Sequence, residues 1–323
     1  MTNLKKCIVG IRDSKLSRAQ TDLFIKEAES YEVIKKNILF EIQTIKTSGD
    51  INKNKRLDTL GGKGLFTKEI EEQILHKSID IGVHSMKDVP ASDETHNLEI
   101  ICWMRRHDPS DAFISYSGQK LELLPAGSII GTSSVRRRAQ ILNLRKDLKI
   151  KLLRGNVDTR IKKLNENQYD GIILSAAGLK RLGQDHLITE IMDHQKFLPA
   201  ACQGTIGIQT KINNDFEEVF KPINHNATQT ESIAEREVLK VINANCNSPI
   251  SVYAKITDNE IDIKCDVFDH NGKCIFKETA KGPAEQAIEL STELGNKIIS
   301  DVGQKNIIQL NILKDDFDYT PKT

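Results

Sequence analysis

One cysteine of this 323-residue chain stands where a thiol could react with a small molecule. Cys246 lies in the segment ANCNSPI, among small polar residues and just ahead of Pro249. A structural cysteine normally packs as a small hydrophobe, but this segment follows an amphipathic helical pattern and has the composition of a turn. The sequence therefore predicts an exposed thiol at position 246.

The other five cysteines have less reactive surroundings. Cys7, Cys102 and Cys265 lie in apolar runs typical of buried strands, Cys274 lies in a similar short run, and Cys202 lies in a predicted loop. No C-x-x-C pair is present, so the spacing indicates neither a zinc site nor a disulfide framework.

Arginine recurs where a predicted strand ends or the next helix begins. A guanidinium binds carboxylate or phosphate through a planar fork, and hydroxyls and backbone donors at a helix N-terminus add to the attraction for an anion. The pattern predicts a cleft for a small polyanion. The arginines in this position are Arg12, Arg136, Arg137, Arg154, Arg160 and Arg181.

The segment HSMKDVP holds a carboxylate, Asp88, directly after a predicted strand. Asp88 is either an ordinary turn aspartate or the one negative group of a basic cleft, suited to stabilising a cation or moving a proton. The residues themselves leave both interpretations open. His84 has no serine or cysteine nucleophile paired with it in sequence, so no catalytic triad is indicated.

The glycine-rich segment GGKG, residues 61–64, matches no nucleotide-binding motif. A P-loop ending at Lys63 needs glycine at the position of Leu57, and a dinucleotide fingerprint starting at Gly62 needs glycine at Thr67. We interpret the segment as a flexible loop that brings Lys63 to a ligand.

Short apolar runs alternate with helical patterns through the first two-thirds of the chain, which is typical of an α/β fold with parallel strands. The runs KKCIVGI, ILFEIQTIKT, DIGVHS and LEIICWM predict strands of a first unit. From DPSDAF onwards, SIIGTSS, KIKLLRG and DGIILSA predict strands of a second unit, each leading directly into a helix. Ligands of such sheets bind at the carboxyl ends of the strands, where the arginines stand.

The pattern changes near Asn226, where a helix is followed by three runs that predict antiparallel strands and then by a closing helix. Asn271-Gly272 predicts a type I′ turn between the second and third of these strands. We therefore expect three domains and a tail. The domains comprise residues 1–103 with 204–221, residues 108–199, and residues 226–315, and the tail comprises residues 316–323.

Charge and hydropathy exclude several classes of function. A formal net charge of +1 argues against a general nucleic-acid or membrane-surface binder. No apolar run approaches the ~20 residues of a membrane helix, and CIVGI is shorter than the roughly 7–15-residue apolar core of a secretory signal. We expect a cytoplasmic protein without nucleic-acid or membrane partners.

Six motifs resemble those of the porphobilinogen deaminase (hydroxymethylbilane synthase) family. They are GGKGLFTKE, VHSMKDVP, DPSDAF, GTSSVRRRAQ, LRGNVDTR and AAGLKRLG. The resemblance extends from about Ile8 to beyond Pro249. It implies a monomeric enzyme that joins four molecules of porphobilinogen head to tail, with loss of ammonia, to give the linear tetrapyrrole hydroxymethylbilane.

The resemblance also implies roles for single residues. Cys246 would carry a dipyrromethane cofactor through a thioether, and Asp88 would face the pyrrole N–H groups and stabilise the positive charge that develops as ammonia leaves. Each pyrrole brings two carboxylates, which the basic cleft would neutralise. The implied carboxylate-binding residues are Arg12, Ser14, Lys63, Lys87, Thr132, Ser133, Ser134, Arg136, Arg137, Arg154, Gly155, Asn156, Arg160 and Arg181, and the further cleft residues are Gln20, Phe66, Ser85 and Gln203.

In fold, the resemblance implies two doubly wound α/β domains of the periplasmic-binding-protein type around the cleft. A smaller α+β domain with a three-stranded antiparallel sheet would present Cys246. The segment from Asp50 to Leu60 would be a mobile flap.

Four residues depart from the family pattern: Thr59, Cys202, Ala244 and Asn245. Glycines usually stand at the last three of these positions, and a lysine at the first. Cys202 is also the alternative to Cys246 as the cysteine that anchors the cofactor. The alternative functions are a non-catalytic or degenerate anion-binding protein of the same fold, and a transferase with a phosphoribosyl donor, for which the chain lacks an acidic cluster beside a phosphate loop.

Overall fold

The computed structural model describes residues 4–51, 64, 66–92 and 97–312. Lys63, Thr59, most of the segment expected to form a flap and the tail at 316–323 lie outside the described residues. The chain divides into two compact units, each described by itself below. The first comprises Met1–His107 and Gly204–Gln229, and the second comprises Asp108–Gln203 and Thr230–Thr323.

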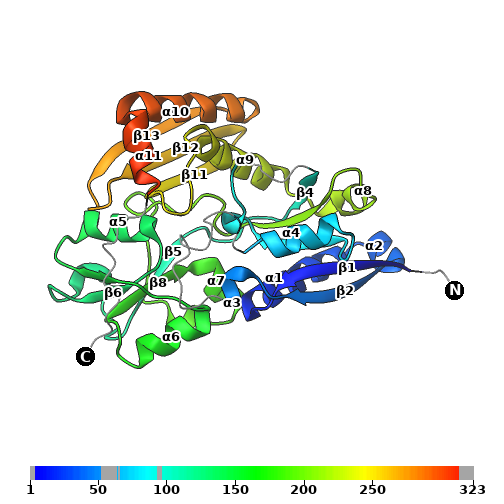
Figure 1. The fold of residues 1–323 in the computed structure, drawn as a ribbon, viewed down its shortest axis with the longest axis horizontal. Coiled ribbons are helices and arrows are strands. Elements are labelled where there is room, and N and C mark those ends of the chain that lie inside the picture. Colours follow the sequence, from blue (N-terminus) through cyan, green and yellow to red (C-terminus); the bar gives the residue numbers. More distant parts are fainter. Residues whose placement is uncertain (1–3, 52–63, 65, 93–96, 313–323) are drawn as a thin grey trace. The chain divides into compact units, whose positions relative to one another are not determined.

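The first unit is built on a five-stranded sheet in the order β2-β1-β3-β10-β4, with its first strands in blue in Figure 1. Strand β1 pairs in parallel with β2 and β3, whereas β10 runs antiparallel to β3 and β4. The strands are β1 (Lys5–Arg12), β2 (Ile38–Ile45), β3 (Ile81–Ser85), β4 (Leu98–Trp103) and β10 (Ile206–Lys211). The helices are α1 (Lys15–Ala28), α2 (Glu32–Asn37), α3 (Ser48–Ile51), α4 (Lys68–Leu75) and α8 (Phe216–Phe220).

The second unit begins with a sheet of the same plan, in the order β7-β6-β8-β5-β9. Strand β6 is parallel to β7 and β8, and β5 is antiparallel to β8 and β9. The strands are β5 (Asp111–Ser115), β6 (Ile129–Gly131), β7 (Lys149–Lys151), β8 (Gly171–Ser175) and β9 (Glu190–Ile191), and the helices are α5 (Val135–Leu144), α6 (Val157–Asn165) and α7 (Ala176–Arg181).

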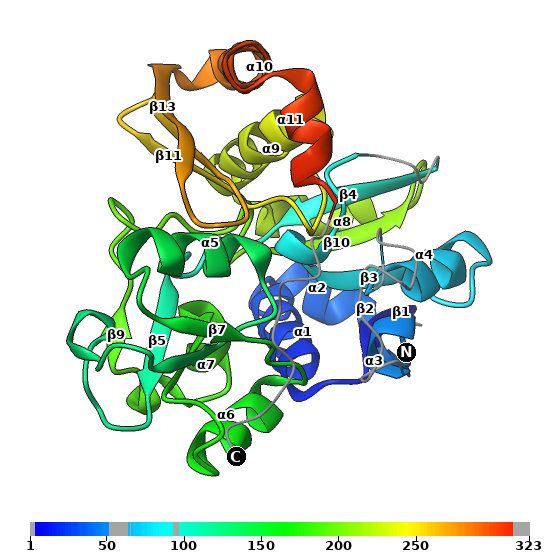
Figure 2. The same cartoon turned by 60° about the vertical axis from the view of Figure 1, so that its left-hand side comes forward.

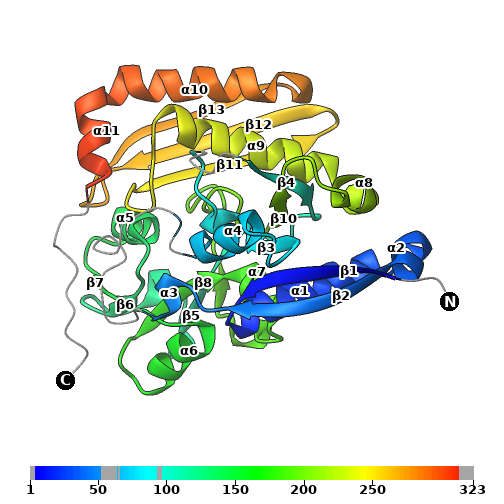
Figure 3. The ribbon, with the colours of Figure 1, turned by 45° about the vertical axis from the view of Figure 1, so that its right-hand side comes forward.

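The second unit continues with a three-stranded antiparallel sheet, ordered β11-β12-β13. Alternate residues of β12, such as Ile261 and Ile263, share one buried core with Val238 and Leu294 from the helices. Helices α9, α10 and α11 accordingly lie along one side of this sheet (Figures 2 and 3). The elements are α9 (Asn226–Val241), β11 (Ile250–Thr257), β12 (Glu260–Phe268), β13 (Cys274–Pro283), α10 (Ala287–Val302) and α11 (Gln304–Leu310).

The α/β fold class and the three-stranded antiparallel sheet are confirmed, with two differences in detail. Each five-stranded sheet carries one antiparallel strand, β10 or β5, so the sheets are mixed rather than parallel throughout. The turn with two residues of positive φ is Asp258-Asn259, between β11 and β12, and not Asn271-Gly272. Asn271 has no positive φ, because the Asp269 carboxylate accepts the N–H of Asn271 and of Lys273 and folds a longer turn.

Candidate functional site

In the first unit, the predicted site residues gather at one edge of the sheet. Strands β1 and β3 are parallel, so Arg12, the last residue of β1, and Asp88, just after β3, lie at the same edge of the sheet. The side chain of Gln20 donates a hydrogen bond to the Ser85 hydroxyl at 2.7 Å. Two predicted cleft residues from α1 and the end of β3 are thereby brought together.

Local capping and stacking fix the first of these segments. The Ser14 hydroxyl accepts the N–H of Ser17 at 3.1 Å and caps the N-terminus of α1. The Arg12 guanidinium lies over the Phe66 ring, 4.0 Å from its centroid, a cation–π arrangement that orients the guanidinium.

Asp88 closes a single 3-10 turn, Met86–Asp88, directly after β3. The turn is tied to the sheet because Met86 donates its N–H to the carbonyl of Thr205. Asp88 is half-buried and Lys87 is exposed. Burial lowers the pKa of the neighbouring His84 to about 4, so this imidazole is neutral near pH 7 and adds no positive charge to the segment.

In the second unit, the hydroxyls predicted to bind an anion stand at the start of α5. The Thr132 hydroxyl accepts the N–H of Ser134 at 3.1 Å, and the Ser134 hydroxyl caps α5 by accepting the N–H of Arg137 at 3.3 Å. Ser133, between them, is half-buried. This arrangement is the N-terminus of a ten-residue helix with its capping groups in place.

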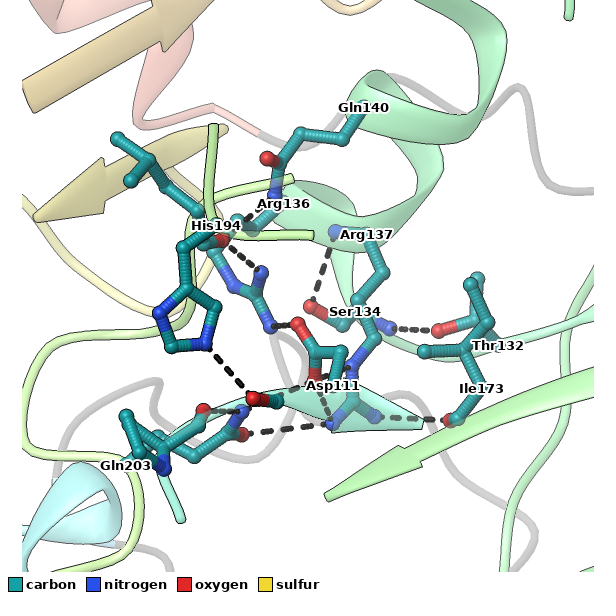
Figure 4. Close-up of polar contacts among 12 residues, drawn as sticks. Asp111, Thr132, Ser134, Arg136, Arg137, Gln140, Ile173, His194 and Gln203 are labelled. Carbon is teal, nitrogen blue, oxygen red and sulfur yellow. Dashed lines mark hydrogen bonds and ion pairs between the residues drawn. The ribbon is translucent and has the colours of Figure 1, made fainter. Parts of the chain in front are cut away.

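Arg136 and Arg137 both bind a buried carboxylate that sequence reasoning missed, that of Asp111 (Figure 4). Arg136 donates to Asp111 Oδ2 at 2.7 Å and to the carbonyl of Leu198 at 2.7 Å. Arg137 donates to Asp111 Oδ1 through both Nε, at 2.9 Å, and Nη2, at 2.6 Å. Asp111 is fully buried and the two arginine side chains are 7% and 8% exposed.

Gln203, predicted as a cleft residue, belongs to the same network. Its amide nitrogen donates to Asp111 at 3.0 Å and to the carbonyl of Pro109 at 2.7 Å, while its amide oxygen accepts from Arg137 at 3.4 Å. Arg137 also donates to the carbonyl of Ile173 on β8 at 3.0 Å. The network thus ties the start of α5 to β5, to β8 and to the segment before β10.

The electrostatics of Asp111 follow from two opposing effects. Burial alone would raise the pKa of this carboxyl, but the adjacent charges of Arg136 and Arg137 and the bond from Gln203 outweigh it and lower the pKa to about 2. Asp111 is therefore ionised at neutral pH, and the cluster of two guanidiniums and one carboxylate keeps a net positive charge. Asp111 lies in the segment DPSDAF, which marks the start of the second unit and matches a family motif, but nothing in that segment pairs the carboxylate with Arg136 and Arg137.

The remaining predicted arginines lie in the segments that follow β7 and β8. Arg154 precedes α6 and Arg160 lies near its start, whereas Arg181 is the last residue of α7, so its predicted place at the start of a helix is wrong. Gly155, in the segment between β7 and α6, has a φ of +112°, which a side chain would disfavour, and its carbonyl accepts from Arg160 Nε at 2.7 Å. Arg154 and Arg181 are half-buried, and Asn156 is exposed. Burial lowers the pKa of Arg181 to about 10, so it too is cationic at neutral pH.

Cys246 lies on the loop between α9 and β11, and all six cysteines fall within the described part of the chain. Cys246 is the exposed one and is not in a disulfide. The loop is shaped by its own polar groups: Asn245 donates its N–H to the Ser248 hydroxyl at 2.9 Å, and Asn247 donates its N–H to the side chain of Asn245 at 2.8 Å.

Four of the other five cysteines, Cys7, Cys102, Cys202 and Cys265, are buried and poorly suited to react with a substrate. Burial raises the pKa of the Cys7 and Cys265 thiols far above the ordinary range and that of Cys102 to about 12, which suppresses the reactive thiolate. Cys202, the rival for the anchor, is 1% exposed, and its thiol donates to the carbonyl of Ser232 at 3.6 Å.

Two family models match the chain. The model described as porphobilinogen deaminase, dipyromethane cofactor binding domain, matches residues 7–218, and the model of the porphobilinogen deaminase C-terminal domain matches residues 229–300. The chain belongs to the porphobilinogen deaminase family. The predicted family is therefore confirmed, and with it the function of hydroxymethylbilane synthesis in tetrapyrrole formation; the non-catalytic alternative is not favoured.

Porphobilinogen deaminases of two bacteria are similar along nearly their whole length. The protein of that name from Carboxydothermus hydrogenoformans is 42% identical over 302 residues, covering 93% of this chain and 96% of the relative. That from Bacillus cereus is 41% identical over 315 residues, covering 95% and 99%.

Solved structures with similarity to the chain include a lipoprotein and an extracellular-binding protein. A YaeC-family lipoprotein from Enterococcus faecalis has a TM-score of 0.41 at 14% identity, covering 73% of this chain and 96% of that one. A probable amino-acid ABC transporter extracellular-binding protein from Bacillus subtilis has a TM-score of 0.41 at 10% identity, covering 73% and 97%.

The residues of this deaminase-family chain fit the dipyrromethane cofactor that names its first family model. A covalently held pyrrole with acidic side chains needs a soft nucleophile and guanidiniums, and the second unit supplies an exposed thiol and arginines at the start of α5.

None of the helices formed by the described residues has both the length and the apolar composition of a membrane-spanning segment.

Proposed function

We propose that the protein is a transferase that condenses four porphobilinogen molecules into hydroxymethylbilane, acting in the cytoplasm as a monomer without nucleic-acid or membrane partners. The observation that carries this proposal is the match of the deaminase family models to both units, combined with an exposed thiol in the second. We further propose a division into three domains, at the boundaries expected from the sequence, because the chain forms three separate sheets.

Cys246 is the residue proposed to hold the cofactor, through a thioether at Sγ. The exposure of its thiol and the burial of Cys202 support this choice over the rival cysteine. The dipyrromethane, when bound, supplies the pyrrole carbon to which new units are added. A thioether suits this task because, unlike an ester to a hydroxyl residue, it resists hydrolysis over many rounds of turnover.

The arginines and their neighbours are proposed to bind the acetate and propionate groups of the pyrroles. Cations that lie at or after strand ends in each unit support this proposal, because a carboxylate-rich ligand requires guanidinium or ammonium partners. The proposed residues are Arg12, Ser14, Lys63, Lys87, Thr132, Ser133, Ser134, Arg136, Arg137, Arg154, Gly155, Asn156, Arg160 and Arg181, with Gln20, Phe66, Ser85 and Gln203 as further contacts.

Arg136 and Arg137 differ in their capacity for this role. A guanidinium has five N–H donors. Arg136 donates to Leu198 and Asp111, whereas Arg137 donates through Nε and both terminal nitrogens to Asp111, Ile173 and Gln203. We propose that Arg136 contacts a ligand carboxylate and that Arg137 mainly fixes the start of α5.

Asp88 is the proposed catalytic residue. A carboxylate beside the pyrrole N–H stabilises the positive charge that develops on the ring as the C–N bond to ammonia breaks. It also accepts a proton after the new C–C bond has formed, from the pyrrole ring carbon of the growing chain to which the incoming unit has been joined. The half-buried position of Asp88 at the end of β3 supports both roles, because the carboxylate is held by a turn and still reachable.

The test is an assay of the full chain with porphobilinogen, in which released ammonia and linear tetrapyrrole are both measured. We expect four ammonia molecules for each hydroxymethylbilane, no product from Cys246→Ser, and normal product from Cys274→Ser, a matched change at a half-buried cysteine of β13. Absence of porphobilinogen consumption by the unaltered chain would refute the function.

A further inference from the structure

Asn311, at the end of α11, holds the loop that carries Cys246 by contacts from outside the loop. The Ser248 hydroxyl donates to Asn311 Oδ1 at 2.5 Å, and Asn311 Nδ2 donates to the carbonyl of Asn243 at 2.9 Å. The Asn245 side chain donates in addition to the backbone carbonyl of Asn311, at 3.4 Å. Asn311 therefore contacts the loop on both sides of Cys246.

Asn311 is anchored next to the hydrophobic core of the second unit. Ile307 and Leu310, within the turn before Asn311, are buried in the same core as α9, α10 and the three-stranded sheet. Asn311 continues the helical hydrogen bonding, because its N–H points to the carbonyls of Ile307 and Ile308. A side chain anchored in the core in this way holds its hydrogen-bond partners in a fixed position relative to the core.

Further contacts of the loop are local: Ala244 donates its N–H to the carbonyl of Leu239, and Ser248 donates its N–H to the carbonyl of Asn245. Asn243 has a φ of +49°, and the segment to Ser248 is stabilised by short-range bonds such as that from Asn245 to the Ser248 hydroxyl. A loop without regular hydrogen bonding samples many conformations unless outside contacts restrict it.

We propose that Asn311 is a positioning residue, which clamps the Cys246 loop in the conformation that accepts the dipyrromethane cofactor. This inference rests on the proposed function, since it takes Cys246 as the attachment point. Asn311 acts through the loop backbone and through Ser248, and it does not touch the ligand. Its effect is to raise the fraction of time that the Cys246 thiol spends in the attachable position.

The experiment measures attachment itself rather than turnover. The full-length chain is produced in cells that cannot make porphobilinogen, so that Cys246 is unmodified, and intact mass is followed after porphobilinogen is added. We expect Asn311→Ala to load about tenfold more slowly than the unaltered chain, as expected for the loss of one or two hydrogen bonds, and to reach the same final mass. Asn311→Asp keeps the acceptor for Ser248 and should fall in between.

Two further variants separate positioning from general stability. Asn306→Ala removes an asparagine of the same helix, whose side chain donates to the carbonyl of Val302 and not to the loop, and it should load at the normal rate. Ser248→Ala removes the partner hydroxyl. If Asn311 acts through Ser248, the double variant should load at nearly the rate of the slower single variant, rather than showing the product of both effects.

The outcomes distinguish the two levels of the proposal. An unaltered chain that gains no mass at Cys246 would refute the proposed function, and the inference with it. Loading of the unaltered chain together with equally fast loading of Asn311→Ala, or multiplicative effects in the double variant, would overturn the positioning role while leaving the function intact.

Discussion

At the scale of single residues, the account depends on two groups with unlike surroundings. Cys246 is the exposed cysteine, while burial keeps the pKa of Cys7, Cys102 and Cys265 high and their thiols protonated. The sequence predicted this division because apolar neighbours mark a buried cysteine and polar ones a turn. Asp88 was undecided from its neighbours, since a turn aspartate and a catalytic one have the same local pattern.

We predict that Asp88→Asn retains the cofactor but loses turnover. The amide keeps the size of the side chain and loses the negative charge and the proton acceptor, so ammonia release should fall by at least about 100-fold. Intact mass should still show the attached pyrroles. The matched control is Asp215→Asn, which removes an exposed carboxylate of the same unit that pairs with Lys5; near-normal turnover by Asp88→Asn would show that its role is wrong.

At the scale of elements, an ion-pair network fixes the start of α5. The carboxylate at its centre, that of Asp111, lies on strand β5. The arginines were predicted as site residues from their position after β6, but Asp111 could not be paired with them from sequence. The pairing depends on β5 lying antiparallel beside β8. The direction of a strand within a sheet leaves no pattern in the strand's own sequence, so this neighbourhood could not be predicted. The type I′ turn predicted at Asn271-Gly272 was wrong for a local reason, because the Asp269 carboxylate accepts the N–H groups of Asn271 and Lys273 and overrides the Asn-Gly preference.

Asp111→Asn should destabilise the second unit strongly. Removing the carboxylate leaves Arg136 and Arg137 buried without their counter-ion, which in such networks costs about 3–5 kcal/mol. Denaturant unfolding measures the loss. Asp147→Asn, which breaks an exposed pair with Arg145 in the same unit, should change stability little. Equal effects of the two substitutions would contradict the central place of Asp111.

At the scale of the whole molecule, the class of fold and the order of elements followed from hydrophobic periodicity, which is a property of each segment. The contacts that join segments did not. Glu235, fully buried on α9, accepts the N–H groups of both Cys202 and Ala254. Cys202 has a φ of +59°, a conformation that usually calls for glycine, and this outside bond helps to hold it.

The stability of the whole chain should depend on Asp111 in a defined pH window. The folded-state pKa of about 2 lies below the ordinary value of 3.8, so the ionised form stabilises the fold. This contribution is complete above pH ~4 and is lost as the pH falls towards 2. The difference in unfolding free energy between the unaltered chain and Asp111→Asn should therefore be constant near neutrality and shrink below pH ~4. A difference that grows on acidification would contradict the assigned pKa.

The central claim is that one sulfur atom, Sγ of Cys246, covalently holds the pyrrole primer. The most direct measurement is the intact mass of the purified chain and of Cys246→Ser, each after incubation with porphobilinogen. We predict an added mass equal to two linked pyrrole units on the unaltered chain, located to the peptide containing position 246, and none on the variant. The same added mass on Cys246→Ser, or an unaltered chain that stays unmodified, would contradict the account.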